Sequence, residues 1–401
     1  MRIDAPRRMV FLDPCDPEFY QNPYPAYHAI RAAAPAFKWE QYGYWCFADH
    51  ERVNALLRDR RFGRQILHVA TRAELGWPDV PSRLKAFYAF EEHSLLELEP
   101  PVHTRLRNLV NRSFLSRNVA RLRPAIASLS NNLIDRFENR NEVDLLAEFA
   151  TPIPVVVICD LLGVPVEMGS QLLSWSHDMV AMYQARRDRA IEDRAVKATL
   201  AFSAFMRDYI ARKREESGDD LLSELIRAEA EGQKLSEDEL VTTAVLLLNA
   251  GHEATVHAIG NGIKALLEQG MTEGIGAGHV EEILRHDAPL HLFTRYALED
   301  MEFAGIGLAK GEQVGLMLGA ANRDPARFEE PDSFRPGREP NPHVSFGAGI
   351  HFCIGAPLAR LELETALPIL FERLPRLALA AKPRYRDTYH FHGLEELRVT
   401  F

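Results

Sequence analysis

The sequence predicts a mainly α-helical protein with small β-sheets, an α+β fold. Four segments in the middle of the chain repeat apolar residues at spacings of three and four with charges between them, as amphipathic helices do: Val119–Phe137, Pro165–Tyr183, Ala195–Glu216 and Asp219–Glu231. Runs typical of strands are short: Tyr44–Ala48, Thr294–Ala297, Gln313–Leu318 and Leu397–Phe401. Such strands are too few and too scattered along the chain to predict a large central sheet.

The longest predicted helix starts after Ser236 and continues to about Gln269. The Ser236 side chain can cap the first turn, and three acidic residues follow where negative charge favours the helix dipole. At about 1.5 Å per residue this helix is close to 50 Å long. Its segment 241–249 is apolar on nearly every side, so we expect it at the centre of the protein, with the Glu253 carboxylate enclosed.

Composition and charge argue against several classes of function. The chain has 401 residues, and its 47 Lys and Arg against 57 Asp and Glu give a net charge of −10, which argues against nucleic acid as the main partner. No long apolar run follows Met1, so we expect neither a secretory signal nor a membrane anchor. Cysteines without a C-x-x-C pair are typical of a reducing compartment and predict a cytoplasmic protein; they are Cys15, Cys46, Cys159 and Cys353.

The most specific stretch surrounds one of these cysteines and reads Phe346-Gly347-Ala348-Gly349-Ile350-His351-Phe352-Cys353-Ile354-Gly355. Its glycines let the backbone approach the sulfur closely, and the helix that follows points its first N–H groups back at it. Such donors stabilise a thiolate. With no second cysteine nearby, the sulfur suits a single axial metal ligand better than a zinc or iron–sulfur site. For a cysteine outside such a pattern, a buried apolar role would be the better interpretation.

This stretch resembles the haem-binding signature F-G-x-G-x-H-x-C-x-G of the cytochrome P450 family of haem-thiolate monooxygenases, and every position matches. The resemblance implies that haem b lies between the long central helix and the cysteine loop, with Cys353 as the axial ligand of the iron. Phe346, Gly347 and Gly355 then belong to the cofactor site. Matching segments run nearly from end to end, so we expect a single catalytic domain over residues 1–401, whose β-richer N-terminal part and helical main part are not independent. Only Gly270–His279, short and Gly-rich, departs from the family.

Two further motifs extend the resemblance. Glu282-Ile283-Leu284-Arg285 matches the E-x-x-R of the family, a structural pair that we expect Arg335 to complete. The segment that starts at Glu99 resembles the start of the helix packed beside the haem, and its side chains would reach the haem propionates. The residues that the resemblance assigns to propionate binding are His103, Arg107, Arg295 and His351.

The stretch from Ala250 to Thr255 resembles the oxygen-activation motif A-G-x-[DE]-T-[TS], in which Gly251 opens a groove for dioxygen and Glu253 links it to solvent protons. Ala254 stands where the family has a threonine, and the hydroxyl of Thr255 is rotated from that place by about 100°. Two alternatives remain open. Either a substrate group or a water held by Glu253 delivers protons in place of the missing hydroxyl, which we favour, or a local helix bulge draws Thr255 in.

Two other patterns are discounted. His252-Glu253 with His257 is similar to the zinc motif H-E-x-x-H, but the second histidine falls one residue late and points about 140° away on a helix. The run Gly274-Ile275-Gly276-Ala277-Gly278-His279 lacks the third glycine of a dinucleotide loop.

The resemblance implies an NAD(P)H-dependent monooxygenase that uses O2 and takes electrons from a separate ferredoxin or flavodoxin with its reductase. We expect a monomer acting on a hydrophobic small molecule that carries a polar or acidic group. An acidic redox partner would meet a basic face formed by Arg105, Arg107, Arg112, Arg335, Arg338 and Arg360. Histidines of the predicted pocket walls are interpreted first as surface residues: His291, His390 and His392. The alternative function is a haem-thiolate ligand sensor or peroxide isomerase without monooxygenation.

Overall fold

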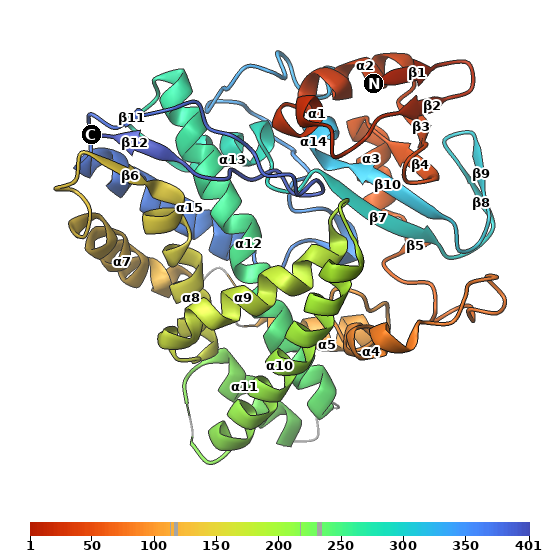
Figure 1. Ribbon diagram of the computed structural model, residues 1–401, viewed down its shortest axis with the longest axis horizontal. Coiled ribbons are helices and arrows are strands. Elements are labelled where there is room, and N and C mark those ends of the chain that lie inside the picture. Colours follow the sequence, from red (N-terminus) through yellow and green to blue (C-terminus); the bar gives the residue numbers. More distant parts are fainter. Residues whose placement is uncertain (113, 116–118, 217, 231–234) are drawn as a thin grey trace.

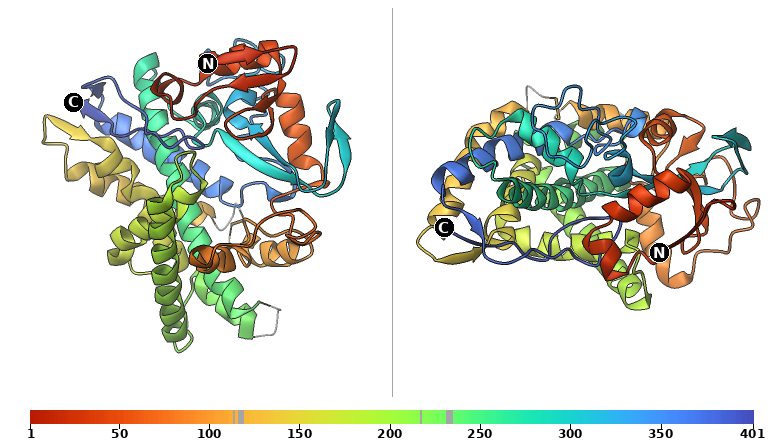
Figure 2. Two further views of the ribbon diagram at one scale, coloured as in Figure 1. Left: turned by 45° about the vertical axis from the view of Figure 1, so that its right-hand side comes forward. Right: turned by 90° about the horizontal axis from the view of Figure 1, so that it is seen from above.

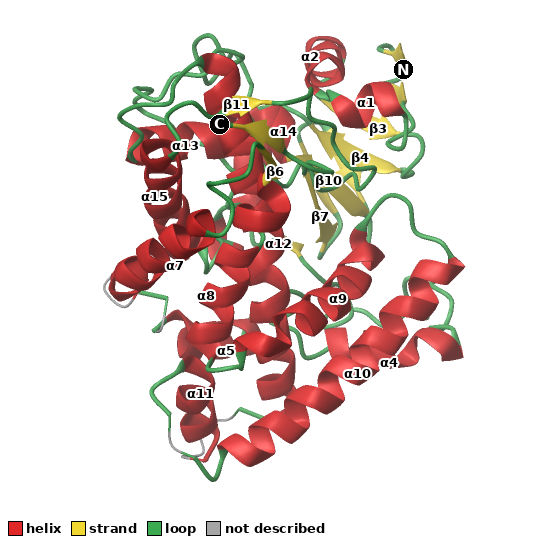
Figure 3. Cartoon of the chain, turned by 60° about the vertical axis from the view of Figure 1, so that its left-hand side comes forward, coloured by secondary structure: helices red, strands yellow, loops and turns green. Residues whose placement is uncertain are grey.

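The computed structural model describes residues 1–112, 114–115, 119–216, 218–230 and 235–401, and shows a helical body with most of the β-structure at one side and a small sheet near the C-terminus at the other (Figure 1). Figure 3 distinguishes helices from strands by colour and shows the strands of the larger sheet grouped beside the helices. The helices are α1 Pro17–Gln21, α2 Tyr24–Ala33, α3 His50–Arg58, α4 Lys85–Glu91, α5 Val102–Asn111, α7 Arg123–Asp135, α8 Pro152–Leu162, α9 Gly169–Val180, α10 Arg189–Lys213, α11 Leu221–Ala230, α12 Glu237–Gln269, α13 Ala277–His286, α14 Leu318–Ala321 and α15 Ala356–Arg373.

The longest helix, α12, confirms the predicted central helix. Ser236 and Glu239 form a reciprocal capping box at its start, and Gly270 ends it in the left-handed conformation with a φ of 64°. Helices α8, α9, α10, α13 and α15 pack against it. Both views in Figure 2 show α12 running through the molecule between the other helices, which explains why its sides are apolar nearly all round.

The other predicted helices also form. The segment 119–137 contains α7, 165–183 contains α9, and 195–213 of the predicted segment 195–216 lies in α10, which begins earlier because Asp188 caps it. The segment 219–231 contains α11, and its last residue, Glu231, lies outside the described residues. No helix in the described part of the chain combines the length and hydropathy that a membrane span requires.

The strands form a larger sheet than the sequence predicts. Seven strands pair in the order β1-β2-β3-β4-β10-β7-β5, with a three-stranded sheet β11-β12-β6 and a two-stranded sheet β8-β9. Three of the predicted runs are neighbours in space, because β10 pairs parallel with β4 and antiparallel with β7. The strands are β1 Arg2–Asp4, β2 Met9–Phe11, β3 Ala36–Trp39, β4 Tyr44–Phe47, β5 Phe62–Gly63, β6 Glu142–Asp144, β7 Leu292–Ala297, β8 Met301–Phe303, β9 Ile306–Leu308, β10 Gln313–Met317, β11 Ala378–Leu379 and β12 Arg398–Thr400.

The E-x-x-R pair is buried completely, but the prediction that Arg335 completes the group is wrong. Arg285 donates two hydrogen bonds to Glu282, at 2.8 and 2.7 Å, and both side chains have no exposed surface. Arg335 contributes only its backbone N–H to Glu282, at 2.7 Å, while its guanidinium faces solvent beside Glu329. Arg338 completes the group, with its Nε 3.3 Å from Glu282 Oε2. The family resemblance pointed to Arg335, whereas the turn that follows brings Arg338 inward.

Candidate haem site

The Cys353 loop has the close-packed backbone that its glycines predict. Gly347 and Gly349 have φ values of 66° and 72°, which residues with a side chain rarely adopt. A Cβ on Gly349 would also lie 2.4 Å from the Leu57 carbonyl oxygen. The Cys353 N–H donates to the Phe346 carbonyl at 2.9 Å, which closes the loop. The backbone N–H groups of Gly355 and Ala356, at the start of α15, interact with the sulfur. Cys353 is an exposed residue of the loop. Burial of its thiol raises the thiol pKa, and the N–H groups of Gly355 and Ala356 oppose this rise because they stabilise the thiolate.

The predicted propionate ligands converge beside this loop. The rings of His103 and His351 lie 4.3 Å apart, centroid to centroid, which joins α5 to the cysteine loop. Arg107, one turn after His103 on α5, donates to the Phe352 carbonyl next to the cysteine. Arg295 comes from β7 and, with 4% of its surface exposed, is nearly enclosed. The structure therefore brings together all four side chains that the sequence grouped.

Two of these side chains, Arg295 and His103, have no carboxylate partner in the described part of the chain, which tests whether haem fits. Arg295 donates to the Thr294 carbonyl at 2.8 Å and forms no salt bridge with a described carboxylate, and burial lowers its pKa to about 9. His103 Nδ1 is buried with no hydrogen-bond partner among the described residues, and burial lowers the pKa of this imidazole to about 4. A planar group with two carboxylates and an iron that needs one thiolate ligand would satisfy both residues and the Cys353 sulfur.

Two residues of this site were not predicted from the sequence. Glu99 accepts a hydrogen bond from His351 Nε2 at 3.0 Å, which orients the imidazole. Glu99 also accepts the backbone N–H of Arg64 at 2.5 Å, and the Arg64 guanidinium pairs with Glu97. Glu99 was present in the recognised segment, without any sign that it would contact His351. Arg64 stands 35 residues upstream of it in an unremarkable context, so only the folded chain reveals it.

The oxygen-motif segment of α12 is an uninterrupted α-helix, so no bulge moves Thr255 into the place of Ala254. Gly251 packs against α8, because a Cβ there would lie 2.8 Å from the Ile158 side chain. The glycine thus permits close contact between α12 and α8. Ala250, one residue earlier, is exposed although the helix around it is mostly buried, which indicates that this side of α12 faces open space.

Glu253 is surrounded by three imidazoles. The Nε2 atoms of His177, His252 and His257 lie 3.2, 3.5 and 3.4 Å from its carboxylate oxygens. His177 comes from α9, and 50% of its side chain is exposed, compared with 12% for Glu253. Burial would raise the pKa of Glu253, but the hydrogen bond from His177 and its other imidazole neighbours lower it well below the usual range. Glu253 is therefore a charged group in contact with solvent through one histidine.

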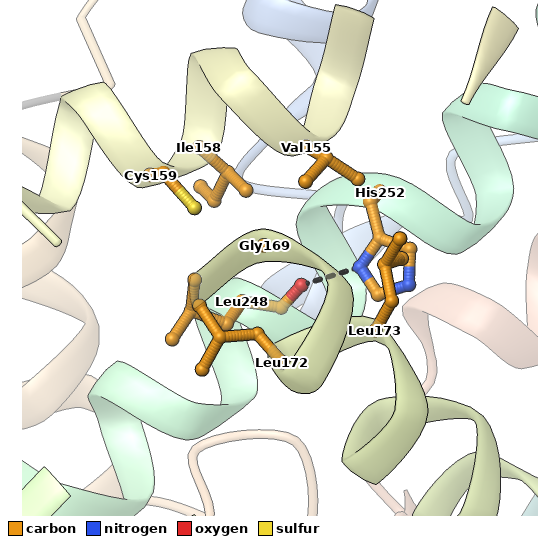
Figure 4. A pocket seen from close by; sticks show the side chains of 8 residues that line it. All are labelled: Val155, Ile158, Cys159, Gly169, Leu172, Leu173, Leu248 and His252. Carbon is orange, nitrogen blue, oxygen red and sulfur yellow. Dashed lines mark hydrogen bonds between the residues drawn. The ribbon is translucent and has the colours of Figure 1, made fainter. Parts of the chain in front are cut away.

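A small, mostly apolar pocket lies next to this cluster, between α8, α9 and α12 (Figure 4). Leu172 of α9 and Leu248 of α12 line it, and His252 lies at one end. The remaining lining residues are Val155, Ile158, Cys159, Gly169 and Leu173.

The interpretation of the pocket-wall histidines as surface residues is wrong. His291 and His392 are buried with 0% and 3% exposure, and their rings stack with centroids 4.5 Å apart. Asp287 accepts hydrogen bonds from His392 Nδ1 at 2.8 Å and from the hydroxyls of Tyr24 and Tyr385 at 2.6 Å each. His390 is also largely enclosed, and burial lowers its pKa to about 4. These histidines form part of the internal packing.

The arginines predicted to form a docking face differ in their availability. Arg338 is only 6% exposed and belongs to the buried Glu282 group, and Arg105 pairs with Glu239 at 2.5 Å. Arg335 and Arg360 are 42% and 31% exposed, each beside a carboxylate. Arg112 is exposed at the end of α5. The face is therefore less basic than six arginines suggest.

Comparisons with known proteins agree with this geometry. The sequence model of the family described as Cytochrome P450 matches residues 76–270 and 278–378, and the gap between these two matches lies within the Gly-rich connection. Cytochrome P450 107B1 of Saccharopolyspora erythraea is 39% identical over 368 residues, 88% of each chain, and the polyketide biosynthesis cytochrome P450 PksS of Bacillus subtilis is 35% identical over 96% of each.

Among solved structures, P450BioI in complex with hexadec-9Z-enoic acid ligated acyl carrier protein aligns with a TM-score of 0.89 and 34% identity, covering 96% of this chain and 100% of that one. Members of this family bind haem b through a cysteine thiolate and act as monooxygenases. A complete cysteine-loop signature, the cationic side chains beside it and similarity along nearly the whole length lead to one conclusion: this chain belongs to the cytochrome P450 family.

Proposed function

We propose that this chain inserts one oxygen atom from O2 into a hydrophobic small molecule, by hydroxylation or epoxidation, with Cys353 as the haem ligand. The observation that carries the proposal is the Cys353 loop beside four cationic or hydrogen-bonding side chains, of which Arg295 pairs with no described carboxylate and His103 Nδ1 with no described group. When bound, haem b supplies the iron at which dioxygen is activated. Reduced protein treated with carbon monoxide should give the difference spectrum of a thiolate-ligated haem, and a spectrum typical of a histidine-ligated haem would contradict the assignment.

The residues of this chain would hold the cofactor from two sides. Cys353 would provide the thiolate that binds the iron, supported by the N–H groups of Gly355 and Ala356. Arg107 and Arg295 would neutralise the two propionates, and His103 and His351 would donate hydrogen bonds to them, with Glu99 fixing the orientation of His351.

Glu253 would carry protons between solvent and the reacting oxygen. Its contact with the half-exposed His177 supports a path from outside, and the small side chain of Ala254 leaves room for a water or a substrate hydroxyl on the other side. The unbroken helix supports this alternative over a displaced Thr255.

The ratio of NAD(P)H consumed to product formed tests this proton path. Thr255→Val should leave the ratio within about twofold of the wild type, since its hydroxyl is not at the oxygen site. Glu253→Gln should slow product formation by about a hundredfold, because an amide cannot transfer a proton. Ala254→Thr restores the family hydroxyl and should leave coupling intact. Strong uncoupling by Thr255→Val would contradict the proposal.

The substrate class follows in part from the relatives. One is named for polyketide biosynthesis, and another was solved with a carrier-bound fatty acyl chain. Both names support an elongated hydrophobic substrate with a polar or acidic end. A spectral titration of the ferric protein against fatty acids, their carrier-bound thioesters and polyketides tests this proposal. A low-to-high-spin change with members of these groups is the expected result, and a response confined to compact apolar molecules would contradict it.

Electrons would come from NAD(P)H through an acidic ferredoxin or flavodoxin that docks near the cysteine loop. Arg112 is the exposed arginine best suited to test it, at the end of the helix that carries Arg107. Arg112→Glu should slow ferredoxin-driven reduction by about tenfold at low ionic strength and less at high salt. Arg376→Glu, an exposed reversal of charge just after α15, serves as the control. Equal rates for wild type and Arg112→Glu at low salt would exclude this docking position.

A second candidate function is favoured by Ala254. Without the usual hydroxyl, the chain could serve as a haem-thiolate ligand sensor or peroxide isomerase. Both functions share the thiolate, so the carbon monoxide spectrum does not separate them. Product formation that depends on NAD(P)H and O2 separates them, since only the monooxygenase consumes both.

A further inference from the structure

The histidines around Glu253 form a cluster that the proposed proton path does not fully use. Nε2 atoms of His177 and His252 lie 3.2 and 3.5 Å from the same oxygen, Glu253 Oε2. These three ligand atoms all lie within 4.8 Å of one another. The sequence motif had suggested a zinc site with His257 as the second histidine, whereas the fold brings His177 from another helix.

His252 uses one ring nitrogen in a hydrogen bond, and no described group donates a hydrogen bond to the other. His252 Nδ1 lies 2.7 Å from the Leu248 carbonyl oxygen, which can only accept, so Nδ1 carries a hydrogen (Figure 4). When the imidazole is neutral, Nε2 is then an acceptor that faces the Glu253 carboxylate, also an acceptor, and the ring must take up a second proton before it can donate to Glu253. This Nε2 is buried and has no hydrogen-bond partner among the described residues. A cation between the two groups would turn this repulsion into attraction.

The distances fit a tetrahedral transition-metal ion. Two ligands at about 2.0–2.1 Å from zinc are about 3.3 Å apart, close to the two observed nitrogen-to-oxygen distances. A backbone carbonyl that accepts the other ring N–H is the usual support of a metal-binding histidine, and Leu248 provides it. His257 Nε2 lies 3.4 Å from the other Glu253 oxygen and can hold the carboxylate in place. The exposed side of His177 leaves a route for the ion and a position for a water ligand.

We propose that a divalent transition-metal ion of the zinc type binds between His177 Nε2, His252 Nε2 and Glu253 Oε2 and inhibits the enzyme. Nitrogen ligands select such an ion over calcium or magnesium. The ion displaces any proton on His177 and occupies the carboxylate that would otherwise transfer protons. The inhibitory part rests on the proposed role of Glu253, whereas the binding part does not.

Calorimetric titration of the haem-loaded protein with zinc chloride tests the binding part. One ion per chain is expected, and His177→Gln should weaken the affinity about tenfold or more. His28→Gln is the matched control, because His28 lies on α2 outside the cluster and contacts Asp332 at 2.9 Å and Arg31 at 2.7 Å. His252→Gln should weaken binding similarly, with the haem spectrum as a check of folding. Absence of stoichiometric binding, or equal affinity in His177→Gln, would overturn the site.

Turnover at the same zinc concentrations tests the inhibitory part. Zinc should inhibit the wild type and His28→Gln, and His177→Gln should need about tenfold more zinc for the same inhibition. Binding without inhibition would overturn the link to Glu253. Because calorimetry requires no turnover, the binding result can be interpreted even if the proposed monooxygenation fails.

Discussion

Replacing Cys353 by serine is expected to reduce product formation to the background level. A serine hydroxyl stays protonated at neutral pH and cannot provide the electron-rich thiolate that favours O–O cleavage. The carbon monoxide difference spectrum of the reduced protein should lose its thiolate character in the same variant.

Cys15→Ser is the control for this substitution. Cys15 is only half-buried and lies near the N-terminus, away from the glycine-rich loop, so its variant should keep both the spectrum and the activity. A Cys353→Ser protein that retains the thiolate spectrum would show that another residue binds the iron.

Replacing Glu282 by glutamine is expected to lower the free energy of unfolding by about 3–5 kcal/mol. The carboxylate neutralises two guanidiniums in the interior, Arg285 with 0% and Arg338 with 6% side-chain exposure. An amide would leave both positive charges without a counter-charge. Chemical denaturation and the haem content of the purified protein measure the effect.

Glu268→Gln provides the matched comparison for Glu282→Gln. Glu268 pairs with Lys264 on the same helix at 2.8 Å, but 41% of its side chain is exposed. A pair of this kind contributes about 0.5 kcal/mol or less. If Glu282→Gln were as mild as Glu268→Gln, the E-x-x-R group would not stabilise the fold.

Features set by local chemistry could be predicted from the sequence. The start of α12 follows from the Ser236 cap, and the cysteine loop follows from glycines that the backbone requires at fixed positions. The propionate ligands were grouped through the family motifs, and the structure brings them together.

Features set by packing between distant segments could not be predicted. Arg338 rather than Arg335 reaches Glu282 because of how one turn folds, and neither residue type nor spacing distinguishes them. His177 meets Glu253 only because α9 crosses α12. Several strands have two or three residues and exist through pairing with partners far along the chain, which no short pattern reveals.

Turnover under O2 labelled with heavy oxygen tests the central claim most directly. Purified protein, NAD(P)H, a ferredoxin and its reductase would be combined with a substrate found by spectral titration, and the product analysed by mass spectrometry. The expected result is a product carrying one labelled oxygen atom, with NAD(P)H consumed in proportion. A product without labelled oxygen, or one formed without NAD(P)H, would contradict monooxygenation.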